Sequence, residues 1–433
     1  DPVLVTTAGP DRVLMQCFPV PPNGGRMKVR IGITSPLHLL DREHGLSAWP
    51  RFIERNFSLA ENLKRSIWVA SRAELSCAAD QLQTVAREDG STGLQGELAE
   101  RELADPHNVL RVHRALPAPD EVWAHGEANV RIEQGLRAIT DVVPRKLVVV
   151  LDGSASMTSE WTAIADSLSA IDSQVDLTVI IATDRADDGW VELGRNDREA
   201  PVIDQVRKYI PVGGQDNVPA LRRGWDLAAE HSGNALLWIH TPIPVLLEST
   251  EGLHQRLERN LGVVRLLDFQ IGEGPNRLVE QLDGLRVKAA VRQGRVAEDL
   301  GTLMTSLVSE SPQWVFERKQ WAGVPNDKGE PASKHVARLW AGSEVQSLAG
   351  RRKFDRAVKL AQDYQLVTPW TGAVVLESQS QYDAAKLSPV DAATVPVVPE
   401  PAVVWLLLAG VAVWFLRNRL GRRKRFAAGR PAR

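Results

Sequence analysis

The chain has 433 residues, a net charge of −2 and a composition that is 43% hydrophobic and 24% charged. This length is enough for two or three domains with cores of their own, and the mildly acidic balance argues against nucleic acid as a partner. Only two cysteines are present, Cys17 and Cys77, which excludes a disulfide framework and leaves open whether the two pair.

Residues 1–140 are predicted to form a β-rich domain. Within 12–34, apolar residues alternate with polar ones from Met27 to Thr34, which predicts a half-buried strand. The prolines just before this strand fit an edge or a loop. Residues 66–75 and 108–117 are also strand-like, and 97–104 favours a short helix.

The phrase Phe18-Pro19-Val20-Pro21-Pro22 resembles the end of a VIT domain, the β-rich module that precedes the A domain in inter-alpha-trypsin inhibitor heavy chains. This resemblance implies that residues 1–140 are the C-terminal part of a VIT-like domain and that the chain begins inside a longer protein. An unrelated β-hairpin would show the same local pattern.

Residues 145–312 alternate between strand and helix patterns, which predicts an α/β domain with a doubly wound, mostly parallel sheet. Its central strand is the uninterrupted apolar run Leu147–Leu151. The further strands are predicted at 175–182, 190–193, 235–240, 263–269 and 285–291. Helices are predicted from Trp161 to Ile171, at 202–210, around 218–225 and at 296–308.

The central strand runs into Asp152-Gly153-Ser154-Ala155-Ser156, at the strand end where open α/β sheets bind ligands. One carboxylate and two hydroxyls at alternate positions suit a hard cation such as Mg²⁺, which prefers oxygen ligands. An ordinary helix start, with Ser156 or Thr158 as the capping residue, would look the same.

Asp-Gly-Ser-Ala-Ser resembles the DxSxS motif of von Willebrand factor A domains, which bind Mg²⁺ at a metal-ion-dependent adhesion site. The resemblance implies ligands from two further loops. Gln215 stands where the family has a Thr, with Asp216 one place later, and Thr241 follows a strand where the family has an Asp. The candidate metal ligands are Asp152, Ser154, Ser156, Gln215, Asp216 and Thr241. Because two of the three loops depart from the pattern, retained Mg²⁺ binding and a vestigial site are both open.

Residues 330–385 resemble the segment that follows the A domain in the same heavy chains and their bacterial relatives, on the phrases Arg338–Ala341 and Leu366–Glu377. We expect a helix and a strand that pack on the body. Trp340, Tyr364 and Trp370 are the large apolar groups of this block and are predicted to be buried.

Residues 386–401 form a Pro-rich linker, and 402–433 combine an apolar run, 402–416, with eight Lys and Arg residues and no acid. Fifteen helical residues span roughly 22 Å, so flanking residues must complete a membrane span. The positive-inside rule places the basic end in the cytoplasm and the body outside. Pro399-Glu400-Pro401 before the run resembles the PEP-CTERM sorting tails read by exosortases, and the whole chain resembles MSEP-CTERM sorting-domain proteins. Cleavage there and a permanent single-span anchor are both open.

These features favour a non-enzymatic protein of the bacterial cell envelope. It would bind a protein or a surface polymer through the A-type domain, as an adhesion or scaffold protein, and it would be attached through its C-terminal helix. The alternative is a purely structural module without metal. A hydrolase that uses Ser154 or Ser156 is the third hypothesis, weakened because no base with an orienting acid is identifiable.

Overall fold

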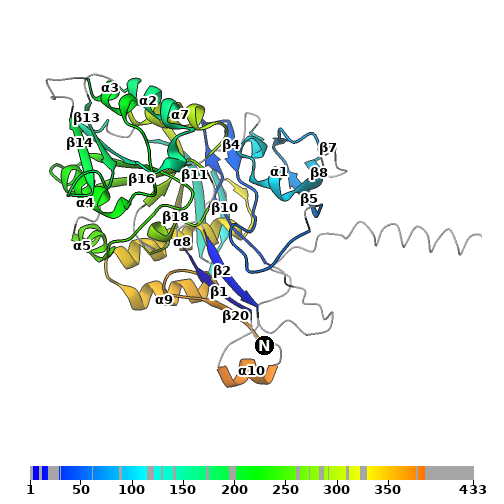
Figure 1. Ribbon diagram of the computed structural model, residues 1–433. Coiled ribbons are helices and arrows are strands. Elements are labelled where there is room, and N and C mark those ends of the chain that lie inside the picture. Colours follow the sequence, from blue (N-terminus) through cyan, green and yellow to red (C-terminus); the bar gives the residue numbers. More distant parts are fainter. Residues whose placement is uncertain are drawn as a thin grey trace, which may run out of the picture.

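The computed structural model describes residues 3–8, 12–17, 29, 31–60, 62–86, 90–114, 121–127, 130–139, 143–171, 175–194, 201–259, 264–272, 274–281, 287–290, 292–308, 312–321, 329–376 and 379–385. Figure 1 shows an α/β domain beside smaller β-sheets, with two long helices packed across the side. The Pro-rich linker, the sorting signal Pro399–Pro401 and the apolar run 402–416 lie outside the described residues.

A six-stranded sheet in the order β14-β13-β12-β15-β16-β17 forms the centre of the α/β domain. All neighbours in it are parallel except the edge strand β14, which is antiparallel to β13. The strands are β12 (Lys146–Asp152), β13 (Asp176–Ala182), β14 (Trp190–Gly194), β15 (Ala235–His240), β16 (Arg265–Gln270) and β17 (Val287–Ala289). The predicted mixed α/β class with a mostly parallel sheet is therefore confirmed.

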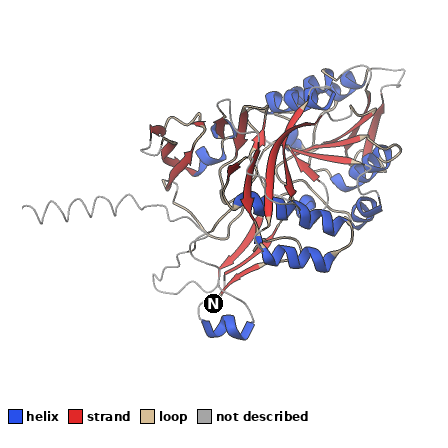
Figure 2. Cartoon of the chain, turned by 180° about the vertical axis from the view of Figure 1, so that it is seen from behind, coloured by secondary structure: helices blue, strands red, loops and turns tan. Residues whose placement is uncertain are grey.

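Helices cover both faces of this sheet, as Figure 2 shows. One face packs against α2 (Trp161–Ser169), α3 (Val202–Lys208) and α7 (Val296–Val308). The other face packs against α4 (Asn217–Ala228), α5 (Glu251–Arg259) and α6 (Arg277–Gln281). The sheet is thus doubly wound.

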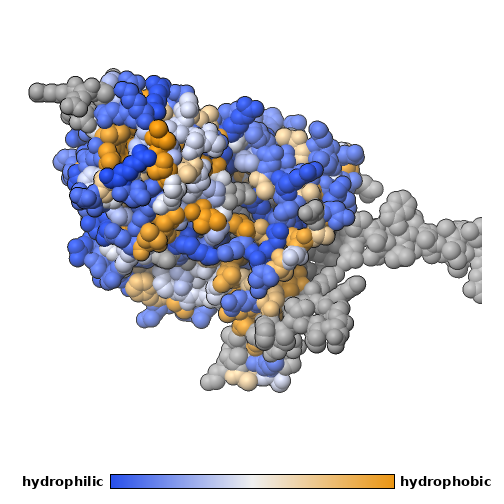
Figure 3. Space-filling model, in the orientation of Figure 1, coloured by the Kyte–Doolittle hydropathy of each residue, from blue (hydrophilic) through white to orange (hydrophobic). Residues whose placement is uncertain are grey.

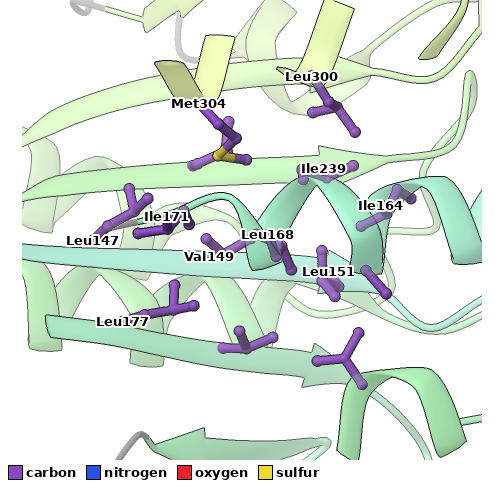
Figure 4. Packing of buried hydrophobic residues seen from close by; sticks show 14 of the residues in the cluster. Leu147, Val149, Leu151, Ile164, Leu168, Ile171, Leu177, Ile239, Leu300 and Met304 are labelled. Atoms are coloured by element: carbon purple, nitrogen blue, oxygen red, sulfur yellow. The ribbon is translucent and has the colours of Figure 1, made fainter. Parts of the chain in front are cut away.

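The central strand β12 explains why both faces are apolar. Leu147, Val149 and Leu151 point to the first face, where Figure 4 shows them among side chains of α2 and α7. Val148 and Val150 point to the other face. Successive residues of a strand alternate between the two sides of a sheet. Because helices cover both sides, all five side chains are fully buried.

The N-terminal part is built from strands, with a short helix, α1 (Glu100–Ala104), and a 3₁₀ turn at Pro106–Asn108 among its described residues. The strands are β1 (Val3–Thr7), β2 (Val13–Cys17), β3 (His38–Leu39), β4 (His44–Ser47), β5 (Lys64–Ser71), β6 (Glu74–Ser76), β7 (Leu82–Ala86), β8 (Thr92–Ala99), β9 (Leu110–His113), β10 (Glu121–His125) and β11 (Arg131–Ile139). Both cysteines are free thiols.

The strand predicted from Met27 to Thr34 is wrong for those of its residues that the structure describes. Met27 and Lys28 lie outside the described residues, but 31–37 are described and form no strand. Ile31 and Ile33 are exposed rather than half-buried. The alternation of apolar residues there has no neighbouring strand to pair with, and the ordered strand of this stretch is β2.

The segment after α7 returns to the hairpin that precedes the α/β domain. Strand β18 (Gln313–Gln320) pairs antiparallel with β11 along its full length, and β19 (Glu330–Pro331) pairs with β10. Helix α8 (His335–Gly350) packs on β10 and β11, and α9 (Phe354–Asp363) packs on α8. Strand β20 (Ala373–Val375) pairs with β1, and α10 (Gln379–Ala385) follows it.

Of the three large side chains predicted to be buried in this block, one is fully so. Tyr364 is 7% exposed, and its hydroxyl accepts a hydrogen bond from the Glu127 backbone N–H at 3.2 Å. Burial raises the pKa of this phenol. Trp340 and Trp370 are only half-buried, although Trp340 packs edge-on against Tyr364.

Among the described residues no helix is long and apolar enough to cross a membrane.

Two helix glycines allow a test of this packing. A Cβ added at Gly224 in α4 would lie 2.7 Å from Val150 Cγ2 and 3.0 Å from Leu236 Cδ1, whereas one added at Gly342 in α8 meets nothing within 4 Å. We expect Gly224→Ala to lower the free energy of unfolding by about 1–3 kcal/mol, because the helix must move away from the sheet. Gly342→Ala should raise it by about 0.5–1 kcal/mol through helix propensity. Urea denaturation measures both, and equal effects would contradict the close α4–sheet contact.

Candidate functional site

The candidate site lies where the order of the sheet reverses. From β12 the chain builds outward through β13 and β14 on one side, and then crosses to β15, β16 and β17 on the other. The carboxyl ends of β12 and β15 are therefore neighbours at the switch point, the place where doubly wound sheets bind ligands. Asp152 ends β12, and Thr241 directly follows β15.

Asp152 is fully buried, and its carboxylate accepts hydrogen bonds from two loops. Oδ1 accepts from the backbone N–H of Ser154 at 3.0 Å and from the Ser154 hydroxyl. Oδ2 accepts from the Thr241 hydroxyl at 2.9 Å and from the Thr241 N–H at 3.4 Å. A carboxylate has about four acceptor positions, so these four donors satisfy it.

The Ser154 hydroxyl also connects to a third loop, because it accepts a hydrogen bond from the Gln215 backbone N–H at 2.8 Å. Two backbone bonds bind the same loops together: Ala155 N–H donates to Gly213 O, and Val212 N–H donates to Gly153 O, each at 2.9 Å. Gly153 is required here, since an added Cβ would lie 2.1 Å from the Ala182 carbonyl oxygen.

The other predicted ligands turn elsewhere. The Gln215 side chain accepts from Asp184 N–H at 2.6 Å and donates to Val212 O at 2.7 Å. Asp216 caps α4 through Val218 N–H and also accepts from Glu248 N–H. Ser156 is exposed on the loop after β12. The structure thus brings together Asp152, Ser154 and Thr241, with only the backbone of Gln215.

A second group of buried polar residues lies beside this site, and the sequence did not predict it as part of the site. His240, at the end of β15, is fully buried; its Nδ1 lies 2.6 Å from the Thr241 carbonyl oxygen and its Nε2 lies 2.8 Å from Asp268 Oδ1. Asn276 contacts both Nε2 and Asp268. Neither His240 nor Asp268 was among the residues predicted for the site, although an acid inside the apolar run of β16 was a usable signal for Asp268.

The donor set fits a divalent cation poorly. Mg²⁺ sites usually use one or two carboxylates with free oxygens. Here the single carboxylate, Asp152, already has its acceptor positions filled, and the nearest further acid of the predicted set, Asp216, is engaged at α4. Within the described residues, no group of three or more His, Cys, Asp or Glu side chains is arranged to hold a metal ion. The metal-ligand roles of the six residues stay predictions.

Comparisons with known proteins give the following similarities. No family model and no curated protein matches the chain. Among solved structures, a von Willebrand factor type A protein from Catenulispora acidiphila is 12% identical, with 44% of this chain and 50% of that chain covered and a TM-score of 0.30. Proximal thread matrix protein 1 from the mussel byssus is 12% identical, with 40% of this chain and 49% of that chain covered and a TM-score of 0.29. The SpRpn10 VWA domain is 12% identical, with 37% of this chain and 94% of that chain covered and a TM-score of 0.26. The chain thus spans about half the length of the first two. The strand order above rests on this chain's own hydrogen-bond ladders.

The hydrogen bonds of Asp152 predict a strong effect of a minimal change. Asp152→Asn replaces one acceptor oxygen by an NH₂ group that faces donors of Ser154 or Thr241. We expect the free energy of unfolding to fall by about 2–4 kcal/mol, because buried donors lose their acceptor. Asp166→Asn, which breaks only an exposed ion pair with Arg207, is the matched control and should cost less than about 1 kcal/mol. Urea denaturation compares the two; similar midpoints would show that Asp152 is not the centre of the loop network.

Proposed function

We propose that this chain is a non-catalytic binding protein, an adhesion or scaffold module of von Willebrand factor A type, in the bacterial cell envelope. Its binding face is the edge of the six-stranded sheet at the switch point. The observation that supports this most is the network of Asp152, Ser154 and Thr241, which holds three loops in a fixed arrangement at the edge where such sheets bind ligands. The partner is a protein or a surface polymer.

The proposal keeps the membrane attachment inferred from the sequence. Residues 402–416 anchor the chain, the basic end 417–433 stays in the cytoplasm, and the body lies outside. Pro399, Glu400 and Pro401 are the proposed sorting signal for an exosortase, and the VIT-like module belongs to 1–140. These parts rest on sequence patterns.

A catalytic role for the serines has little support in the site. The Ser154 hydroxyl is buried, donates to Asp152 and accepts from Gln215 N–H, so it is engaged inside the loop network and not presented to a substrate. The nearby histidine, His240, has both ring nitrogens engaged by Thr241 and Asp268. A nucleophilic serine needs a base within hydrogen-bond reach, and no described histidine contacts Ser154 or Ser156.

Site-specific photocrosslinking tests the proposed binding face. A photoreactive phenylalanine analogue at Ser156, which is exposed in the loop after β12, should give a discrete crosslinked species in the native cells. The same group at Ser343, exposed on α8, is the control and should not give that species. The same product from both positions, or none from Ser156, would place binding elsewhere.

We propose further that Mg²⁺ is not required for this binding, since neutral hydroxyl donors already satisfy Asp152. The alternative, a metal-dependent site, predicts that Mg²⁺ raises the melting temperature of the wild-type chain. We expect no such shift.

Thr241→Asp offers the converse test. It places a second carboxylate against Asp152, and two like charges in one buried site repel. We expect a lower melting temperature without metal and recovery with millimolar Mg²⁺, because a cation relieves the repulsion. A wild-type chain that gains stability from Mg²⁺ as the variant does would favour the metal-dependent alternative.

A further inference from the structure

The two loops beside the candidate site carry unusual apolar exposure. Among the large hydrophobic side chains that the structure describes, the three most exposed are Leu247 at 79%, Ile210 at 66% and Ile243 at 63%. Ile210 lies in the loop between α3 and α4, and Ile243 and Leu247 lie in the loop after β15. Figure 3 shows how hydrophobic patches interrupt an otherwise hydrophilic surface. Exposed large aliphatic side chains on neighbouring loops are characteristic of an interaction surface.

The backbone that carries these side chains is held in place from several directions. Asn217 N–H donates to Val245 O at 3.1 Å, and Glu248 N–H donates to the Asp216 carboxylate at 2.9 Å. The Gln270 side chain donates to Pro242 O at 2.9 Å. The apolar groups are therefore displayed on fixed loops, so a partner that covers them spends little free energy on ordering them.

Acidic side chains lie on a third loop that adjoins these two. The loop after β13 exposes Asp184, Asp187 and Asp188, and none of the three forms an ion pair within the described residues. This loop adjoins the site, because Asp184 N–H donates to the Gln215 side chain. An added Cβ on Gly189 would also lie 3.2 Å from Pro219 at the start of α4.

The bases in the same region offset these acids only in part. Arg222 pairs with Glu248, and Arg185 lies over the ring of Tyr209. Lys208, exposed two residues before Ile210, is the third base. Three bases against the three aspartates and Glu248 leave a net charge of −1. Such a field attracts cationic segments and repels anionic lipid or nucleic acid.

We propose that this rim, defined as Ile210, Ile243 and Leu247 with Asp184, Asp187 and Asp188, docks a basic and apolar segment of a partner protein. The segment carries Lys or Arg next to aliphatic or aromatic side chains. The proposal rests on the proposed function, because it uses the same edge of the sheet, and it specifies the partner's charge. The aliphatic groups supply the contact area, and the aspartates select cationic partners and speed their encounter.

Fluorescence anisotropy with two labelled peptides tests the charge preference. One peptide alternates leucine with lysine, and the other alternates leucine with glutamate. We expect the lysine peptide to bind the full chain at least tenfold more tightly, with an affinity that falls as salt is raised, because salt screens exposed charges. Equal binding of both peptides would overturn the proposal.

Variants locate the binding. Ile243→Ser with Leu247→Ser should weaken the lysine peptide roughly tenfold, and Asp187→Asn with Asp188→Asn should weaken it severalfold and flatten the salt dependence. The matched control, Val13→Ser with Leu14→Ser, removes two exposed apolar side chains of β2 and should change nothing. Unchanged melting temperatures verify that the exposed substitutions leave folding intact. Control and rim variants that lose affinity equally would overturn the proposal.

A peptide of residues 417–433 serves as the third probe, since it is the basic segment of this chain itself. If it binds the rim more tightly than the leucine–lysine peptide, the occupant is the chain's own tail and the partner proposal is wrong. The crosslink at Ser156 distinguishes failure of the proposed function from failure of the proposed docking surface. A specific crosslink that survives the rim variants would retain the proposed function and reject this docking surface.

Discussion

The buried carboxylate of Asp152 is the interaction on which the site depends. Removing a carboxylate from water costs several kcal/mol unless protein donors replace the lost hydration. Those donors come from Ser154 in the following loop and from Thr241 at the end of the next parallel strand. Because Ser154 in turn accepts from Gln215, a third loop is placed by the same charge. One carboxyl group thus connects three surface loops.

This arrangement is possible only because the strands beneath it are apolar on both sides. Strands β12 and β15 pair in parallel from Leu147–Ala235 to Leu151–Ile239, so Asp152 and Thr241 lie close together just past the last pair. Apart from Lys146 at the start of β12, the side chains along both strands are buried. Helix α4 approaches the sheet closely at Gly224, which keeps its N-terminus, with Asp216 as cap, beside the loops of the site. The packing of the apolar core therefore also fixes where the polar residues at the sheet edge lie.

Much of the α/β domain was predictable from the sequence, for a physical reason. Strands buried on both faces are continuous apolar runs, and runs such as 147–151 and 235–240 have no competing interpretation. The position of Asp152 and Thr241 followed from the ends of those runs. The strand expected around Met27 to Thr34 had only an alternating pattern, and its described residues form no strand because no neighbour pairs with them.

The loop details were less accessible. Whether Gln215 or Asp216 turns toward Asp152 depends on backbone geometry that adjacent residue types do not reveal. Asp216 could have been recognised as a helix cap, since Asp before a helix commonly accepts from the first backbone donors. Gln215 could not, because its partner, the Asp184 backbone, comes from a loop more than thirty residues earlier in the chain. Long-range backbone contacts of this kind leave no local pattern.

Thr241 joins two buried charge-bearing groups, and this explains the polarity of the site. A carbonyl oxygen only accepts, so His240 Nδ1 donates to the Thr241 carbonyl, and Nε2 faces Asp268 at 2.8 Å. Asp268 has the imidazole and the Asn276 amide as partners, whereas Asp152 has the donors of Ser154 and Thr241. Thr241 serves both, with its hydroxyl and N–H directed to Asp152 and its carbonyl to His240. An acid at position 241 would bring a third carboxylate into this buried cluster without a matching proton or cation. The threonine therefore lets the loops pack against Asp152 without an added cation, while the aliphatic side chains of Ile243 and Leu247 stay exposed on the outer side of the same loop.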